Sequence, residues 1–356
     1  MNANRARARD LGIAPGQYEP GPKNGITDVL GVRVGHTTLI QGTDIRTGIT
    51  AIVPGQLRDR RSLPAGLFVG NGYGKLIGAT QLVELGEIET PILLTGTLSA
   101  FRCADALISH MLSLPGNEAV TSVNPVVGET NDGFLSDIRA RPITEAHLFS
   151  ALHGANAAPV AEGCVGAGTG TRALGFKAGI GTSSRVVELP GYGQPVTVGA
   201  LVQANFSGVL TVLGVPIDRD AALAEAGAPD PDSDMERGNS CMIVVATDAT
   251  LNARQLGRLA RRAIFGMGRT GAHFTHRSGD YAIAFSTSAE ASIPDGKLDP
   301  IFIAVQEAVE EAILNSLFMA ETTSGHGARV RYAVPLSYVG KLLRSRGVTL
   351  GRTSDA

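Results

Sequence analysis

Two side chains that could act as nucleophiles follow one another where a polar segment gives way to an apolar run. The stretch 235–248 reads MERGNSCMIVVATD, in which Gly238-Asn239 precede Ser240 and Cys241. A serine hydroxyl is a weak nucleophile until a nearby base takes its proton. If the bond before Ser240 opens, the new α-amine can be that base, because its reference pKa is about 7.7–8.0. The pattern is therefore compatible with an N-terminal nucleophile, although an ordinary strand end is the commoner explanation of such a pattern.

The residues on either side of this bond suit a cut there. Asp218–Arg237 holds seven acidic residues and two prolines and lacks a strand pattern in its second half, which predicts an exposed linker. Cys241–Ala246 is uniformly apolar and predicts a central strand. Small residues before Ser240 let the backbone reach the strained geometry in which the hydroxyl attacks the preceding carbonyl. A cut one residue later would free Cys241 instead, but strand alternation turns that side chain to the opposite side.

Composition and charge exclude several classes of protein. The net charge is −2 and the isoelectric point about 6.4, which gives no electrostatic case for binding nucleic acid or an anionic membrane. No apolar run is long enough to span a membrane, and no apolar segment follows the early arginines as in a secretory signal. Three cysteines far apart argue against a disulfide scaffold. We therefore expect a cytoplasmic protein with no nucleic-acid or membrane partner.

Other motifs that could carry chemistry are weak. Gly166, Gly168 and Gly170 follow a GxGxG spacing instead of the GxGxxG of a dinucleotide cradle, so they indicate tight turns and close strand packing. The seven histidines are scattered, and neither CxxC nor HExxH occurs, so we predict no metal and no cofactor. The absence of GxSxG argues against an α/β-hydrolase triad.

Hydrophobic patterning predicts strands and helices that do not alternate regularly. The expected strands include 29–34, 50–53, 67–69, 92–95, 196–202, 210–212, 241–246, 281–286 and 330–334. The expected helices include 100–112, 142–152, one capped by Asn252 or Thr250, and one that starts at Asp299-Pro300 with the aspartate as N-cap. This order favours α+β layers over a doubly wound sheet. Residues 1–22 are polar and rich in Gly and Pro, and we expect an arm there.

Seven stretches of the sequence together favour the N-terminal nucleophile over the ordinary strand end. They are NGITDVLGVRVGHTTL (24–39), GLFVGNGYGKLIG (66–78), PVVGETNDGFLSDI (125–138), GCVGAGTGTRALGFKAGIGTSSR (163–185), VGALVQANFSG (198–208), GNSCMIVVATDATL (238–251) and SGDYAIAFSTS (278–288). In order and spacing they resemble the P1 peptidase family, which contains L-aminopeptidase/D-esterase-amidases and β-peptidyl aminopeptidases. The resemblance covers about residues 22–345. It implies a four-layer αββα sandwich over 23–356, similar to N-terminal nucleophile hydrolases but with different strand connectivity.

The resemblance also implies how such an enzyme is made and what it does. The precursor cleaves itself between Asn239 and Ser240 into an α chain (1–239) and a β chain (240–356), which stay associated, usually in a homo-tetramer. Ser240 at the new N-terminus is then the nucleophile. It releases N-terminal residues from small peptides, amides or esters through an acyl-enzyme. The resemblance does not specify whether the substrate is an α-peptide, a β-peptide or a D-residue amide.

Three further positions match the family's catalytic motifs. Asn205 matches an asparagine whose amide donates to an oxyanion, an interaction worth about 2.7–4 kcal/mol in comparable sites. Ser278 and Asp280 match a serine and a carboxylate that orient the amine and hydroxyl of Ser240. Family members have glutamate at the second position, and the shorter Asp280 would need a bridging water.

The block 128–137 is the expected wall of the substrate site. Glu129 is the first candidate and Asp132 the second for binding the substrate ammonium, although both could instead cap turns. Phe134 lies where some relatives have a tyrosine hydroxyl near the oxyanion, so one donor would be absent.

Two other functions stay open on the sequence. An acyl-enzyme at Ser240 could be resolved by an amine, which would make the protein an acyltransferase; ornithine acetyltransferases use a similar fold. The chain could also keep the fold without the cut, as an inactive binding scaffold. The departures at Asp280 and Phe134 favour this second alternative.

Overall fold

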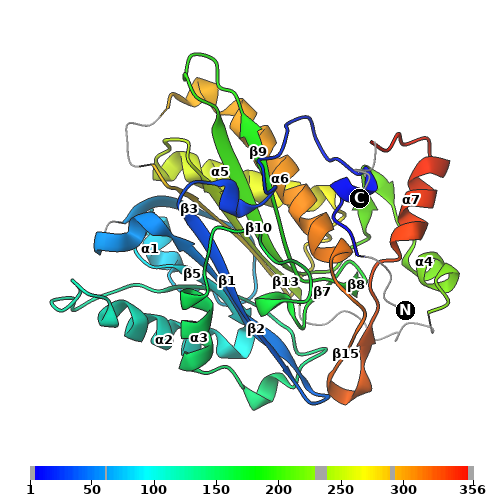
Figure 1. Cartoon of the computed structure of the whole chain (residues 1–356), viewed down its shortest axis with the longest axis horizontal. Coiled ribbons are helices and arrows are strands. Elements are labelled where there is room, and N and C mark those ends of the chain that lie inside the picture. The colour runs from blue at the N-terminus through cyan, green and yellow to red at the C-terminus, as the bar shows by residue number, and fades with distance from the viewer. Residues whose placement is uncertain (1–4, 61, 229–238, 289–292, 352–356) are drawn as a thin grey trace.

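The computed structural model describes residues 5–60, 62–228, 239–288 and 293–351, and its strands form two main sheets (Figure 1). The smaller sheet has the order β1-β2-β5-β6 and comprises β1 (Val32–Gln41), β2 (Ile45–Pro54), β5 (Ile92–Gly96) and β6 (Val126–Thr130). The larger sheet has the order β4-β3-β14-β13-β10-β9 and comprises β4 (Glu87–Ile88), β3 (Leu63–Gly72), β14 (Ser278–Ser286), β13 (Asn239–Thr247), β10 (Val196–Asn205) and β9 (Ile180–Val187). Short ladders join β7 (Arg172–Ala173) to β8 (Phe176–Lys177), β11 (Thr211–Val212) to β12 (Val215–Pro216), and β15 (Thr323–Ser324) to β16 (Val330–Arg331).

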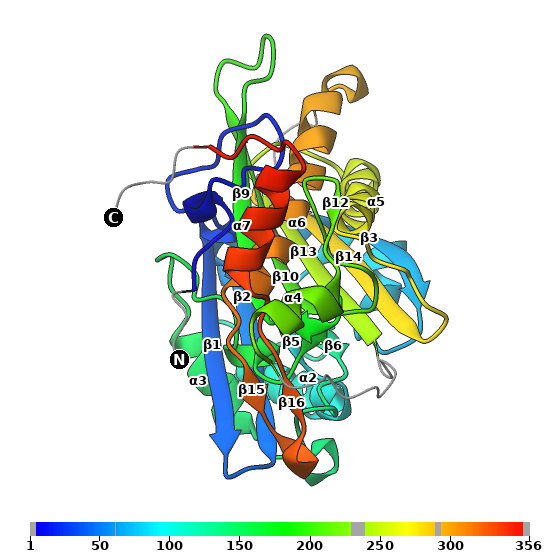
Figure 2. The same cartoon turned by 90° about the vertical axis from the view of Figure 1, so that its right-hand side faces the viewer.

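The two sheets stack face to face and helices cover their outer faces (Figures 1 and 2). On the smaller sheet lie α2 (Ala100–Ser113) and α3 (Glu145–His153). On the larger sheet lie α5 (Ala253–Arg269) and α6 (Asp299–Phe318), while α1 (Ala79–Glu84) packs beside β3 and β4. This arrangement confirms the expected α+β class with four αββα layers. Of the two caps that the sequence allows for α5, Asn252 is the one observed, and it forms a capping box with Gln255.

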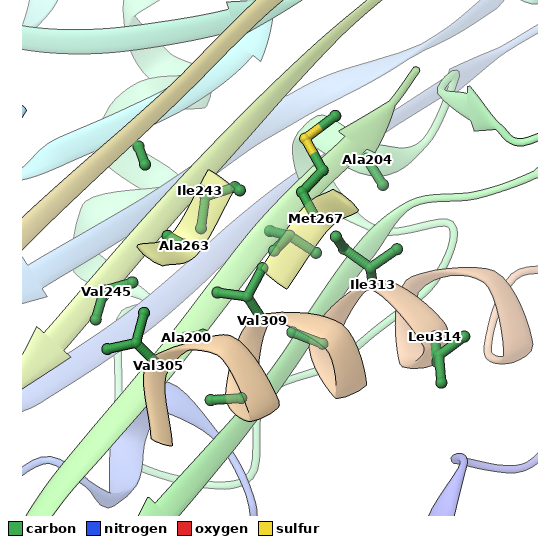
Figure 3. Packing of buried hydrophobic residues seen from close by; sticks show 14 of the residues in the cluster. Ala200, Ala204, Ile243, Val245, Ala263, Met267, Val305, Val309, Ile313 and Leu314 are labelled. Atoms are coloured by element: carbon green, nitrogen blue, oxygen red, sulfur yellow. The ribbon is translucent and has the colours of Figure 1, made fainter. Parts of the chain in front are cut away.

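Alternation along β13 sends successive side chains into two different cores. Met242 and Val244 pack between the two sheets, whereas Cys241 and Ile243 pack between the larger sheet and its helices. Figure 3 shows the helix-side core, in which apolar side chains of β10 and β13 meet those of α5 and α6. Both faces of β13 are therefore covered, which explains why its sequence is an unbroken apolar run.

The segment expected to be a linker contains a helix. Within Asp218–Arg237, α4 occupies Arg219–Glu225, because the Asp218 side chain accepts the N–H of Ala221 and caps the first turn. The second half of that segment, 229–238, lies outside the described residues.

Several boundaries differ from the prediction: the strand expected from residue 29 begins at Val32, and the helix expected from residue 142 begins at Glu145. The strand expected at 330–334 is only the two residues of β16, because the chain then leads through Pro335 into α7 (Leu336–Ser345). At the start of α6, Asp299 is the first helical residue and Leu298 is the N-cap, one residue earlier than expected.

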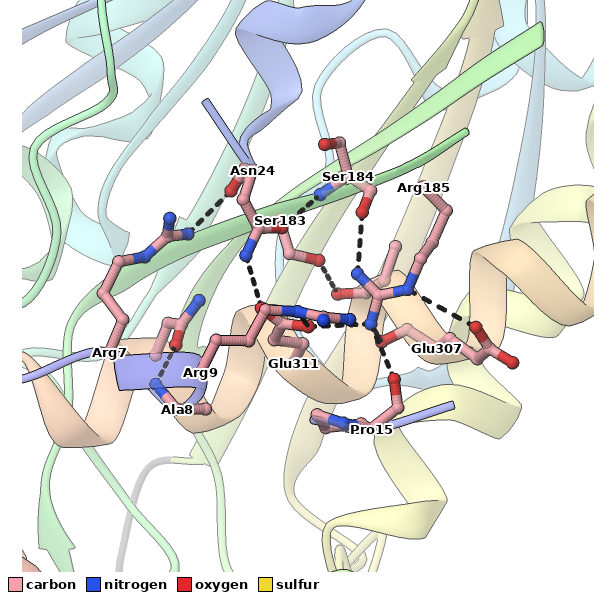
Figure 4. A network of polar contacts seen from close by, with 12 residues as sticks. Arg7, Ala8, Arg9, Pro15, Asn24, Ser183, Ser184, Arg185, Glu307 and Glu311 are labelled. Atoms are coloured by element: carbon pink, nitrogen blue, oxygen red, sulfur yellow. Dashed lines mark hydrogen bonds and ion pairs between the residues drawn. The ribbon is translucent and has the colours of Figure 1, made fainter. Parts of the chain in front are cut away.

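Hydrogen bonds and ion pairs hold the residues before β1 against α6 and β9 (Figure 4). The N–H of Ala8 donates to Asn315 Oδ1, and Arg9 Nε pairs with Glu311 Oε2 at 2.9 Å. Glu311 also pairs at 2.8 Å with Arg185, a fully buried arginine of β9. None of the described helices is long and apolar enough to cross a membrane.

Candidate active site

The larger sheet brings Ser240 and Asn205 together at one end of its central strands. Antiparallel pairing of β10 with β13 sets Asn205 opposite Ser240, and parallel pairing of β13 with β14 sets Ser240 beside Gly279. Ser240 lies two residues before Met242 on β13, so both side chains point to the same face. The Ser240 side chain therefore faces the layer between the sheets. The Ser240 residue is only 4% exposed. The site is thus enclosed by both sheets.

A main-chain N–H contacts the Ser240 hydroxyl. The N–H of Asn131, one residue beyond β6, donates to Ser240 Oγ at 3.2 Å. This bond positions the nucleophilic oxygen, whereas an oxyanion would form on the neighbouring carbonyl oxygen that it attacks. Sequence analysis did not select Asn131, because every residue except proline carries a main-chain N–H and the sequence has no signal for its direction.

The orientation of the Asn205 amide is fixed by the backbone. Asn205 Oδ1 accepts the N–H of Arg172 at 3.2 Å, so the NH2 group is the end that would donate to an oxyanion. Two residues earlier, the buried Gln203 donates through Nε2 to Thr130 Oγ1 and to two main-chain oxygens. These bonds tie β10 to the smaller sheet and hold Asn205 in register with Ser240.

Ser278 and Asp280 lie next to the Ser240 backbone, not on the side of its hydroxyl. Strand pairing sets Ser278 beside Asn239 and Asp280 beside Cys241, so both side chains project to the helix-side face of the sheet. Ser278 Oγ donates to Asp280 Oδ1 at 2.8 Å, while Asp280 Oδ2 has no hydrogen-bond partner among the described residues. Burial raises the pKa of Asp280 to about 6, although the Ser278 hydrogen bond opposes this shift.

Glu129 lies beside Gly74 and Tyr281. Its carboxylate accepts the main-chain N–H of Lys75 at 2.9 Å, and Lys75 Nζ is 3.6 Å away. A Cβ at Gly74 would stand 2.9 Å from Glu129 Oε1 and 3.8 Å from the Tyr281 hydroxyl, so both groups border this glycine. Burial, followed by the carboxylates of Glu129 and Asp280, raises the pKa of Tyr281. Tyr281 therefore stays protonated near neutral pH and can donate a hydrogen bond.

Asp132 is buried slightly more deeply than Glu129, whose carboxylate contributes to raising the pKa of Asp132. Burial raises its pKa to about 6, against the opposing effect of a hydrogen bond with Thr47. A Cβ at Gly96 would stand 2.7 Å from Asp132 Oδ2, an oxygen without a hydrogen-bond partner in the part of the chain that the structure describes. The Asp132 carboxylate therefore packs closely against Gly96.

Phe134 is surrounded by three arginines, which sequence analysis did not select. The guanidinium carbons of Arg172, Arg331 and Arg329 lie 4.0, 4.5 and 5.5 Å from the centroid of the Phe134 ring. Arg329 and Arg331 are two residues apart, and the fold brings Arg172, more than 150 residues earlier, to the same ring. Across the described ranges, no group of His, Cys, Asp and Glu side chains is arranged to hold a metal ion.

Comparison with known proteins identifies the family of the chain. The model of peptidase family S58 matches residues 24–331. The chain belongs to peptidase family S58. It is 39% identical to the β-peptidyl aminopeptidase BapA of Sphingosinicella xenopeptidilytica, over 96% of this chain and 91% of that protein. The family assignment confirms the resemblance found in the sequence motifs.

Two solved structures of the family superpose on nearly the whole chain. A β-aminopeptidase from Burkholderia sp. is 38% identical with a TM-score of 0.84, and covers 96% of this chain and 99% of its own. The L-aminopeptidase D-Ala-esterase/amidase of Ochrobactrum anthropi is 35% identical with a TM-score of 0.85 and the same coverage. That enzyme is described as a prototype of the serine aminopeptidases and a new variant of the N-terminal nucleophile hydrolase fold. The S58 chain is therefore an aminopeptidase with this fold.

Proposed function

We propose that the chain cleaves itself between Asn239 and Ser240 and that Ser240 is the nucleophile of the resulting aminopeptidase. The observation that carries the proposal is the start of β13 at Asn239, with the Ser240 hydroxyl directed between the sheets and held by the Asn131 N–H. The first chain would be 1–239 and the second 240–356.

The maturation step needs only the chain and water. The Ser240 hydroxyl attacks the Asn239 carbonyl, an Oγ–C bond forms, and the C–N bond between the two residues breaks. Water then hydrolyses the ester, which leaves a carboxylate on Asn239 and both a hydroxyl and an α-amine on Ser240. Ser278 and Asp280 lie beside this stretch of backbone and would orient the new amine.

The same hydroxyl would then attack the substrate. The Ser240 amine takes the hydroxyl proton and passes it to the departing amine or alcohol, and water hydrolyses the acyl-enzyme. The Asn205 amide would donate to the oxyanion in place of a tyrosine at Phe134. Substrates would be small peptides, amides or esters with a free N-terminus.

Glu129 is the proposed site for the substrate ammonium. It is a 5% exposed carboxylate near the nucleophile, with a main-chain N–H to hold it in place. Asp132 is the second candidate, although its deeper burial favours a neutral carboxyl group near pH 6. Tyr281, which borders Glu129 at Gly74, adds a hydrogen-bond donor to this end of the site.

Association and location are also part of the proposal. We expect the two chains to stay together and to assemble as a homo-tetramer, which sizing of the purified enzyme measures. The three cysteines are unbridged, in keeping with a reducing cytoplasm.

Intact mass under denaturing conditions tests the cut. The wild-type protein should give two masses that sum to the chain plus one water, with one fragment starting at Ser240. Ser240→Ala should stay intact and lose activity on an amino-acid p-nitroanilide, whereas the neighbouring Cys241→Ala should still be cut at the same bond. Cleavage of Ser240→Ala at this bond would show that the nucleophile is another group. A wild-type chain that stays intact for days would support the uncleaved scaffold.

A further inference from the structure

A pocket of about 360 Å³ lies on the helix-covered side of the smaller sheet. It is bordered by the end of β2, the residue before β5 and the C-terminal ends of α2 and α3, which lie side by side on this sheet (Figure 1). Seven of the ten lining residues are apolar, and the other three are Arg33, His110 and His153. This volume is at the lower end of the range of about 300–1,000 Å³ for small-molecule pockets.

The pocket and Ser240 lie at opposite ends and on opposite faces of the smaller sheet. β5 begins directly after the lining residue Pro91 and runs parallel to β6, which ends at the residue before Asn131. The Asn131 N–H that contacts Ser240 is therefore at the far end of these strands. The lining residue Met111 belongs to the core between the smaller sheet and its helices, whereas Ser240 faces the layer between the two sheets. The smaller sheet thus separates a molecule in the pocket from the proposed nucleophile.

Arg33 brings a permanent positive charge to the wall of the pocket. Antiparallel pairing of β1 with β2 sets Arg33 opposite Val53, which packs against the core beneath α2 and α3, so both side chains lie on the same face. Arg33 is half-buried, and its guanidinium makes no hydrogen bond or ion pair within the part of the chain that the structure describes. A guanidinium stays protonated in proteins and binds a carboxylate through two parallel N–H donors. Arg33 is therefore free to bind an anion here.

The two histidines add polar groups without a second permanent charge. The ring centroids of His110 and His153 are 6.1 Å apart, and both rings contact Phe149. Burial, followed by the charge of His153, lowers the pKa of His110. Near neutral pH the His110 ring is therefore neutral and can donate one N–H. The described lining includes neither aspartate nor glutamate, so the pocket offers a fixed positive charge and no negative one.

These properties define the chemistry of a ligand. The apolar walls favour a ligand that removes an apolar or aromatic body from water. The single guanidinium of Arg33 matches one carboxylate. Free amino acids and peptides with a free N-terminus do not fit, because their ammonium group would lose its water without a carboxylate in the lining to replace it. That excludes both the substrates and the amino-acid products of the proposed aminopeptidase.

We propose that this pocket is a second ligand site, which binds a small monocarboxylic acid with an apolar or aromatic body and no free amine. The carboxylate pairs with Arg33, and the body packs against Val53, Met111 and Leu152. The proposal does not depend on which residue is the nucleophile. A bound acid stabilises the folded protein by mass action, because the unfolded chain has no such pocket.

Isothermal titration of the purified enzyme with 4-phenylbutanoate provides the test. We expect one molecule to bind per protomer with a Kd on the order of 0.1 mM. Two relatives of this acid share its body: 4-phenylbutanamide lacks the charge, and 2-amino-4-phenylbutanoate adds an ammonium group. Each should bind at least about tenfold more weakly than the acid.

Three variants locate the bound acid. Arg33→Gln should weaken binding of 4-phenylbutanoate by about tenfold, while kcat/KM for alanine p-nitroanilide changes by less than about twofold. Leu114→Phe narrows the pocket and should weaken the acid as well. Arg346→Gln removes an exposed arginine after α7, outside the pocket, and should leave the Kd unchanged. Melting midpoints without ligand show whether each variant is folded.

Several results would overturn the second site. These are no binding at a concentration about a hundredfold above the expected Kd, equal affinity for the acid and its amide, and unchanged affinity in a folded Arg33→Gln protein. Competitive inhibition of hydrolysis by 4-phenylbutanoate that persists in Arg33→Gln would instead place the acid in the aminopeptidase site.

Discussion

Asp280 is a buried carboxyl group with one hydrogen-bond donor, and this environment decides how it titrates. The Ser278 hydroxyl donates a hydrogen bond to one carboxylate oxygen of Asp280. Burial raises the pKa of Asp280 to about 6 from a usual value near 3.8. Between these values the folded protein keeps a proton that the unfolded chain has lost, so folding becomes less favourable as pH rises. Next to the Ser240 backbone, a group that titrates near neutrality is well placed to exchange a proton with an amine.

Replacing this carboxyl group by an amide should stabilise the precursor. Asp280→Asn keeps the oxygen that accepts from Ser278 but cannot ionise. In the uncleaved Ser240→Ala background, the gain in free energy of unfolding that Asp280→Asn brings over Asp280 should grow from pH 4 to pH 7 by up to about 3 kcal/mol. Urea unfolding at several pH values measures this. In the cleaved enzyme the same substitution should lower kcat, because the oriented carboxylate is lost.

A substitution without an ionisable group supplies the control for this experiment. Val83→Ala, at an exposed position of α1, should give a difference that stays constant across the same pH range. A constant difference for Asp280→Asn as well would mean that Asp280 ionises as in water.

Side chains with a motif could be found from the sequence, and main-chain groups could not. Ser240 and Asn205 were selected from family motifs, and strand pairing sets them opposite one another. The Asn131 N–H was not predicted, because its role depends on where the main chain points this N–H, which the sequence does not show. The three arginines around Phe134 were missed for a different reason: Arg329 and Arg331 are neighbours in the sequence, but Arg172 is distant from both, and no local pattern links any of them to Phe134.

The packing of α6 on β9 depends on a buried set of charges. Arg185 is fully buried and donates to Glu311 at 2.8 Å and to Glu307 at 3.4 Å, both on α6 (Figure 4). It also donates to the main-chain oxygen of Pro15, so one guanidinium joins the helix, the sheet and the N-terminal segment. Charges this deep are tolerated only while every partner remains.

Removing this arginine should be among the most destabilising changes in the fold. Arg185→Met removes the ion pair of the buried Glu307 and leaves the buried Glu311 with Arg9 alone, so it should cost about 3–5 kcal/mol in free energy of unfolding. Converting Glu307 and Glu311 to glutamine as well should recover part of that loss. Urea unfolding in the Ser240→Ala background provides the measurement.

An exposed ion pair is the matched control. Arg254 pairs with Asp295 at 2.6 Å, but the side chains are 62% and 45% exposed, so Arg254→Gln should cost less than about 1 kcal/mol. If Arg185→Met costs no more than this control, the network does not hold α6 in place.

Elements with strong local signals were predicted, and those set by the tertiary structure were not. The residue types alone place the cap of α5 at Thr250 or Asn252, and the second is observed. The acidic composition of the segment after Asp218 gave no helical signal for α4, whose 7 residues are held by the cap and by packing beside α7. The glycines of 163–185 were assigned to close packing, and Gly181 fits this, because a Cβ there would stand 1.9 Å from the Ala312 carbonyl oxygen.

A cut before Ser240 would assign the strands of the larger sheet to two chains, but these strands would still pair in one sheet. β13 and β14 would belong to the second chain, yet β10 flanks them on one side and β3 on the other, both from the first chain. Helices α5 and α6 of the second chain cover strands of the first as well. Each product alone would expose long apolar strand edges, so neither can fold on its own. The layered fold would therefore hold the two products together after the proposed cut.

The melting behaviour of the two forms tests this interleaved arrangement. Unfolding of the cleaved protein releases two chains, so mass action makes its melting midpoint rise with protein concentration. The uncleaved Ser240→Ala protein unfolds to one chain, and its midpoint should depend less on concentration in the same oligomeric state. Calorimetric scans over a hundredfold range of concentration compare the two. Native size exclusion should show both fragments in one peak, and their separation without denaturant would contradict the shared sheet.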